Sequence, residues 1–142
     1  MINKRDVVRI KMPFPDINSN LALNAHMYIC HNILGNEHHF IKCQTLKPYM
    51  LSSRVMKHYW DEEPNIQRNP FSRLTRIDCD KEFVTKNILY HDCMRTTLRP
   101  DVCSDVMSNV ERELLSDGYD IHSINTYELL LLNNALQDGK HV

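Results

Sequence analysis

Short alternations of apolar and polar residues mark the first element of the chain. Residues 6–12 place Val8, Ile10 and Met12 at every second position. Side chains alternate between the two faces of a β-strand, so this period of two predicts a strand with one buried face. Pro13 ends the pattern, because proline cannot donate a hydrogen bond to a sheet.

Two more strand patterns surround a glycine turn. Residues 26–31 and 39–44 are rich in apolar and aromatic residues, and the segment between them contains Gly35. This arrangement predicts a β-hairpin. Further along the chain, residues 73–80 are predicted to form a strand, and residues 83–94 a short hairpin or strand pair.

Two segments lack a regular pattern. Residues 16–20, rich in Asp, Asn and Ser, are predicted to form a turn or loop. The longer segment 47–70 holds three prolines and the acidic run 61–63, with a helical turn predicted only around residues 53–59. An unstructured loop of this length is unusual in a compact domain, so a functional or interface role is favoured for it.

Two helices are predicted after the strands. Pro100 suits the first turn of a helix and Gly118 its end. The residues between them place apolar side chains at a helical spacing of four, at Val102, Val106, Val110 and Leu114. Strands followed by helices predict an α+β domain around an antiparallel sheet or barrel.

The second helix is predicted over residues 125–137, with Asn125 or Thr126 as its cap. Its apolar face would consist of Leu129, Leu132 and Leu136. This face is expected to pack on the sheet or on a second copy of the chain, and each fully buried leucine contributes about 1.5–3 kcal/mol. Self-association is therefore expected.

Composition sets the class of protein. A chain of 142 residues, 42% hydrophobic and 25% charged, fits one globular domain. Since no apolar run approaches the ~20 residues that span a bilayer, no membrane span is predicted. The first residues lack a secretory signal pattern, so a cytoplasmic location is expected.

The five cysteines are irregularly spaced, which predicts reduced thiols, and no spacing of Cys or His is typical of a metal site. No metal or other cofactor is therefore expected.

Charge is distributed unevenly along the chain. Residues 1–100 hold 15 Lys and Arg against 10 Asp and Glu, a net charge of +5, whereas residues 101–142 hold 2 against 8, a net charge of −6. A local basic surface for nucleic acid is therefore compatible with the near-neutral total. Alternatively, the asymmetry reflects ordinary solvated charges on the surface together with acidic helices near the C-terminus.

Five short motifs follow one another in order. They are Arg5-Asp6-Val7-Val8-Arg9-Ile10, Phe14-Pro15-Asp16, Cys43-Gln44-Thr45, Cys79-Asp80-Lys81-Glu82-Phe83 and Leu98-Arg99-Pro100. Over about residues 4–117 this order resembles the MazF/PemK toxins of type II toxin–antitoxin systems. The resemblance implies a small SH3-like antiparallel β-barrel (MazF/CcdB-like) with a terminal helix in residues 1–117. The helix predicted in residues 118–142 lies beyond the resemblance and is expected to pack on the same domain.

The resemblance also implies a function. Such toxins are usually homodimers that cleave single-stranded RNA without a metal and are neutralised by a protein antitoxin. Members of the family usually carry an Arg-Pro pair at the start of the second strand, where this chain has Asn24-Ala25. Asn24 donates a hydrogen bond to a substrate but supplies no positive charge, so altered or lost activity is expected.

The remaining candidate residues each have a structural alternative. Thr45 matches the family's hydroxyl after the third strand and is expected to contact phosphate, or else to cap a strand end. Arg76, Asp78 and Asp80 share one strand face by their period of two, as an acid/base group or as a solvated ion-pair ladder. His26 is a candidate replacement base, because its pKa lies near neutrality, or else a partly buried structural histidine.

Basic and aromatic residues also gather in the irregular segment. Lys47 and Arg54 are expected to bind substrate, beside aromatic residues on which bases stack, namely Tyr49, Tyr59 and Trp60. The same residue types favour a protein interface.

Three functions follow from these patterns: a metal-independent endoribonuclease, a catalytically silent MazF-like module that inhibits or sequesters a protein partner, and an RNA-binding module without cleavage.

Overall fold

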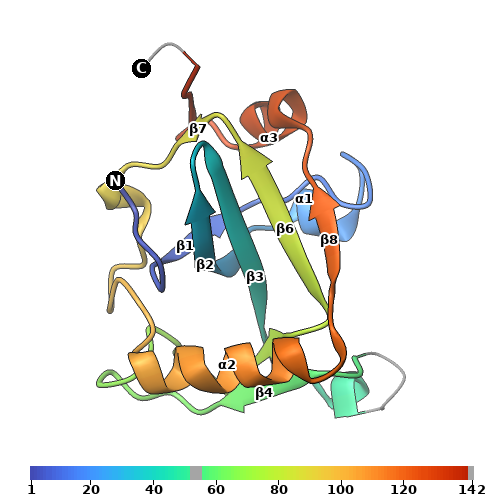
Figure 1. Ribbon diagram of the computed structural model, residues 1–142, viewed down its shortest axis with the longest axis vertical. Coiled ribbons are helices and arrows are strands. Elements are labelled where there is room, and N and C mark those ends of the chain that lie inside the picture. The colour runs from blue at the N-terminus through green and yellow to red at the C-terminus, as the bar shows by residue number, and fades with distance from the viewer. Residues whose placement is uncertain (52–55, 141–142) are drawn as a thin grey trace.

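The computed structural model describes residues 1–51 and 56–140 and has an α+β architecture built on a mostly antiparallel sheet (Figure 1). The sheet contains seven strands: β1 (Val7–Ile10), β2 (His26–Leu34), β3 (Glu37–Thr45), β4 (Tyr59–Glu62), β5 (Thr75–Asp78), β6 (Lys81–Lys86) and β8 (Asp120–Ser123). A second, two-stranded sheet pairs β7 (Ile88–Leu89) with β9 (Gln137–Asp138). The helices are α1 (Asn20–Leu23), α2 (Ser104–Asp117) and α3 (Thr126–Leu132), with 3₁₀ turns η1 (Pro48–Leu51) and η2 (Asp92–Met94).

The β2–β3 hairpin is the longest element of the sheet. Each strand has nine residues, and both extend beyond their predicted bounds. Gly35 in the connecting turn has a φ of 61°, which glycine adopts without a steric penalty. The predicted hairpin is confirmed.

β3 lies at the centre of the sheet and has partners along both edges. It pairs with β2 on one side, whereas on the other its first half pairs with β6 and its second half with β5. β4 continues the sheet beyond β5, and β8 adds to β6 in the parallel direction. Within residues 1–51 and 56–140, no ladder joins β1 to β4 or β8, so the described strands do not form a closed barrel.

Apolar side chains form two clusters on opposite faces of the sheet. Val8 belongs to one cluster and its neighbour Val7 to the other, because consecutive side chains of a strand point to opposite faces. α2 covers the cluster of Val7, and α3 contributes Leu129 to the cluster of Val8. Figure 1 shows α2 crossing one end of the sheet beside β4, with α3 at the other end.

The first long helix starts later than predicted. α2 begins at Ser104, because Pro100 and Val102 are extended along β1: the Pro100 carbonyl accepts from the Val7 N–H (2.9 Å), and the Val102 N–H donates to the Arg5 carbonyl (3.0 Å). The predicted helix end at Gly118 is confirmed.

The second helix ends earlier than predicted. α3 stops at Leu132, after which the Asn133 side chain donates to the carbonyls of Leu129 and Lys11, both at 2.8 Å. Leu129 and Leu136 are both buried within this chain's own core. Among the described residues, no helix is long and apolar enough to cross a membrane.

Several strand predictions need correction. Residues 83–94 do not form a hairpin, since β6 pairs with β3 and β8 while β7 pairs with β9. β4 lies inside the segment predicted to be irregular, and α1 begins at the end of the predicted 16–20 loop. The helical turn predicted around residues 53–59 lies partly outside the described residues, and Tyr59 already belongs to β4.

A buried carboxylate joins three strands. Glu82, on β6, is 1% exposed and accepts hydrogen bonds from Nδ1 of His31 (2.5 Å) on β2 and Nδ1 of His39 (2.7 Å) on β3. The register of β2 shifts between Cys30 and Asn32, and such a bulge redirects the extra residue, here His31. Burial alone would raise the pKa of Glu82, but the hydrogen bonds from the two histidines lower it below its usual value.

We expect Glu82→Gln to lower the free energy of unfolding by about 1–3 kcal/mol at pH 7, because the two histidine donors lose a charged acceptor. The exposed Glu63→Gln is the matched control, with a change within about 0.5 kcal/mol. Since the pKa of Glu82 is lower in the folded protein, its contribution is present above the ordinary value of 4.5 and disappears as the pH falls through the folded value. Urea denaturation between pH 3 and 7 measures this, and equal stability of the two variants at pH 7 would contradict it.

Candidate functional site

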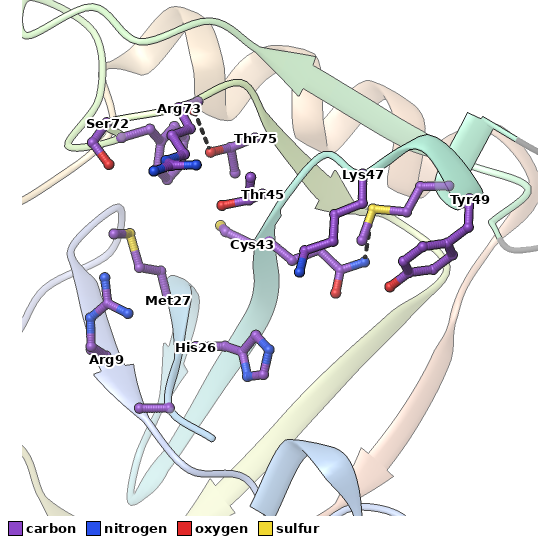
Figure 2. A pocket seen from close by; sticks show the side chains of 14 residues that line it. Arg9, His26, Met27, Cys43, Thr45, Lys47, Tyr49, Ser72, Arg73 and Thr75 are labelled. Carbon is purple, nitrogen blue, oxygen red and sulfur yellow. Dashed lines mark hydrogen bonds between the residues drawn. The ribbon is translucent and has the colours of Figure 1, made fainter. Parts of the chain in front are cut away.

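A cleft opens where β2 begins and β3 ends (Figure 2). It has a volume of about 350 Å³ and receives side chains from β1, β2, β3, η1 and the residues around the start of β5. Its polar lining includes Arg9, His26, Gln44, Thr45, Lys47, Tyr49, Ser72, Arg73 and Thr75, and its apolar lining includes Met27, Met50 and Phe71. The cleft combines positive charge and hydroxyl groups with apolar surface.

Positive charge enters the cleft from three separate segments. Arg9 comes from β1, Lys47 from the residue before η1, and Arg73 from the segment before β5, and all three are exposed. In the described part of the chain, no Asp or Glu lines the cleft and none of these cations forms an ion pair. Arg and Lys unpaired with protein carboxylates are suited to bind phosphate groups.

His26 stands at the first residue of β2 with a defined tautomer. Its Nδ1 lies 3.0 Å from the carbonyl oxygen of Asn24. A carbonyl only accepts hydrogen bonds, so the neutral ring carries its proton on Nδ1, and Nε2 has a free lone pair. Burial, and then the positive charges of Lys42, Arg9 and Lys47, lower the pKa of His26 below 6.5. The imidazole is therefore neutral at pH 7 and can accept a proton.

Thr45 and Thr75 face each other across the β3–β5 ladder and both line the cleft. The Thr75 hydroxyl donates to the Arg73 carbonyl (2.9 Å), which ties the segment carrying Arg73 to the end of β5. Figure 2 shows Thr45, Thr75 and Arg73 close to one another, with Lys47 and Tyr49 on the rim formed by the residues after β3. The predicted residues Thr45, His26 and Lys47 thus meet in one cleft.

Arg76 has a different environment from the one predicted. It follows Thr75 in β5 and so points to the opposite face of the strand. Its Nε and Nη2 each donate to Asp61 at 2.8 Å, and its Nη1 donates to the Met50 carbonyl. The Tyr59 ring centre lies 3.6 Å from the guanidinium carbon. Arg76 therefore holds β4 and η1 against β5.

The two predicted aspartates also lie outside the cleft. Asp80 follows the end of β5, where its carboxylate accepts from the backbone N–H groups of Lys57 (2.8 Å) and His58 (3.0 Å). It lines a second cavity, of about 630 Å³. Asp78 is buried, accepts from the Asp80 N–H (2.8 Å) and pairs with Lys81 (2.9 Å). Of the candidate residues Thr45, Arg76 and Asp80, only Thr45 therefore lines the basic cleft.

Asn24 is exposed and contributes its carbonyl to His26 rather than a cation to the cleft. Arg54 lies outside the described residues. The sequence-based prediction missed Arg9 and Arg73. Arg9 reaches the cleft because β1 pairs with β2 in a register that sets Arg9 opposite Met27, and the sequence alone does not show this register.

Within residues 1–51 and 56–140, no group of three or more His, Cys, Asp or Glu residues is arranged to hold a metal ion. Comparisons of the chain with models of known families, with curated proteins and with solved structures find no match. The function must therefore be argued from the chemistry of the cleft.

We expect Arg76→Met to lower the free energy of unfolding by about 2–4 kcal/mol, because it leaves Asp61 and the Met50 carbonyl without their donor. The matched control is Arg73→Met, which removes an exposed guanidinium and should change stability by less than about 0.5 kcal/mol. Urea denaturation at pH 7 compares the two variants. If both unfold at the same urea concentration, Arg76 does not have this structural role.

Proposed function

We propose that the basic cleft binds single-stranded RNA and cleaves it without a metal, and that the protein is a divergent toxin of the MazF/PemK type. The observation that carries the proposal is a neutral histidine with a free Nε2 among cations that no described carboxylate neutralises. Cleavage by the RNA's own 2′-hydroxyl needs a base for that proton and positive charge for the phosphorane oxygens. His26 supplies the first, and Arg9 and Arg73 the second.

In the proposed reaction, side chains of the cleft accept and donate the protons. The 2′-oxygen forms a bond to phosphorus while its proton passes to Nε2 of His26. The bond from phosphorus to the 5′-oxygen breaks, and that oxygen takes a proton from the Lys47 ammonium. The products are a 2′,3′-cyclic phosphate and a 5′-hydroxyl, and Thr45 contributes a hydroxyl to the phosphate oxygens.

The arginine proposed to bind phosphate in this cleft comes from a different segment of the chain than the arginine implied by the family resemblance. Asn24 stands where the resemblance implies an arginine, and Arg73 reaches the same cleft from the segment before β5. Positive charge is therefore supplied by another segment of the chain. The SH3-like barrel, a homodimer and a protein antitoxin are part of the same proposal, with the described strands in the open order β1-β2-β3-β5-β4.

A second candidate function is a silent binding module that inhibits or sequesters a protein partner. Arg76 and Asp80 favour it, since both residues have structural contacts where the resemblance implied chemistry. The two functions differ in one result, because only the first one shortens RNA.

We expect the purified protein to cut a mixed single-stranded RNA in excess EDTA and to leave 2′,3′-cyclic phosphate ends. His26→Gln should lower kcat/KM by about 10²- to 10⁴-fold and Arg73→Gln by about 10²-fold, since they remove the base and a phosphate cation. His91→Gln and Arg112→Gln are controls at surface positions outside the cleft. Intact RNA at micromolar protein would overturn the proposal and favour the silent module.

The pH dependence tests the base separately. Because only neutral His26 accepts a proton, the rate should rise with pH and reach its plateau through a pKa below 6.5. Arg9→Gln should move this midpoint upward, because a neighbouring cation no longer opposes protonation. Measurement of kcat/KM from pH 4.5 to 8 gives both midpoints. An unchanged midpoint in Arg9→Gln would argue against His26 as the base.

A further inference from the structure

The rim of the cleft that carries Lys47 is fixed by a buried anchor. Met50, in η1, is 2% exposed. Its carbonyl accepts from Arg76, and its sulfur accepts from Nε2 of Gln44 at 3.4 Å. The Met50 N–H donates to the Lys47 carbonyl (2.9 Å), which closes the turn. Met50 therefore holds this short turn to β3, through Gln44, and to β5, through Arg76.

The anchor leaves one aromatic side chain free at the cleft. Tyr49 lies next to Met50 in the chain, lines the cleft and is 62% exposed. Figure 2 shows its ring beside Lys47, at the edge of the cleft. A large aromatic side chain beside an anchored residue offers an apolar face to a ligand, and tyrosine loses little conformational entropy when it binds.

The other two aromatic residues of the predicted stacking surface are already engaged. The Tyr59 ring is covered by the Arg76 guanidinium at 3.6 Å. Trp60 packs against the α2-side core and donates its Nε1 hydrogen to Glu62 (3.2 Å). Of these three, Tyr49 is the one that the structure presents to the cleft.

We propose that Tyr49 is a stacking platform for one unpaired base, next to the scissile phosphate, and that it restricts the cleft to single-stranded nucleic acid. A base in a duplex already stacks on both faces, whereas an unpaired base has a free face for an aromatic ring. Lys47, the proton donor of the proposed cleavage, is two residues away from Tyr49 in the chain, so the stacked base lies next to the bond that breaks. The location of that phosphate rests on the proposed function, but stacking itself requires no cleavage.

The test uses the full chain and a fluorescent ten-nucleotide 2′-O-methyl RNA, which cannot be cleaved because its 2′-oxygen is blocked. Fluorescence anisotropy in EDTA at low, fixed salt measures its dissociation constant. Tyr49→Leu should weaken binding about 5- to 100-fold, whereas Tyr49→Phe should bind like the parent protein because the ring is kept. Tyr127→Leu, at a tyrosine of α3 that is 70% exposed, is the matched control and should change nothing.

Two further probes separate stacking from charge. A self-complementary duplex of the same length should bind the parent more weakly than the single strand. An oligonucleotide without bases should bind the parent and Tyr49→Leu equally. Equal binding of the single strand by Tyr49→Leu and the parent, or equal binding of duplex and single strand, would overturn the platform.

The outcome also separates this inference from the proposed function. Tyr49-dependent binding without cleavage of ordinary RNA would retain the platform and overturn the endoribonuclease. Cleavage with an unchanged KM in Tyr49→Leu would retain the endoribonuclease and overturn the platform. A failure of every single strand to bind would overturn both.

Discussion

The shared edge of β3 is the constraint on which the rest of the molecule depends. One nine-residue strand has β6 as its partner over Glu37–Phe40 and β5 over Cys43–Thr45. β6 and β5 therefore follow one another along the same edge of β3. The core clusters on the two faces of this sheet include residues of α2 on one face and α3 on the other. The cleft lies at the end of β3 that pairs with β5, beside the start of β2.

Much of the sheet could be predicted from its local pattern, because β1 carries apolar residues at alternate positions and β2 and β3 are rich in apolar and aromatic residues on either side of Gly35. β4 and β8 lack that signal. β4 is held by contacts from distant positions, such as the Asp61 carboxylate with Arg76, and its own sequence offers no apolar alternation. In β8 the single aliphatic residue, Ile121, is exposed, and the aromatic contact to β6 comes from His122, whose ring centre lies 6.1 Å from that of Phe83. Local sequence does not contain such long-range information.

In the candidate site, the residues positioned by the β2–β3 hairpin could be predicted from the sequence, and those positioned by other segments could not. His26, Thr45 and Lys47 lie at strand ends that the hairpin brings together, and the sequence already identified that hairpin. Arg76 was misassigned because a period of two identifies which residues share a face but not which face is open. Asp80 was misassigned because β5 ends at Asp78, after which the chain turns. Arg73 was missed because β5 begins at Thr75 and not at the predicted residue 73, so Arg73 reaches the cleft from the segment before the strand.

The tail of the chain folds back to the turn of the β2–β3 hairpin. The Gly139 N–H donates to the Asn87 carbonyl (2.7 Å), and the Asn87 N–H donates to Asn36 in that turn (3.0 Å). The cleft lies at the other end of the hairpin, about 30 Å away for nine residues of strand. A dye or a surface linkage attached near Lys140 would thus leave the cleft facing solution, which makes this end a suitable handle for immobilisation on a biosensor.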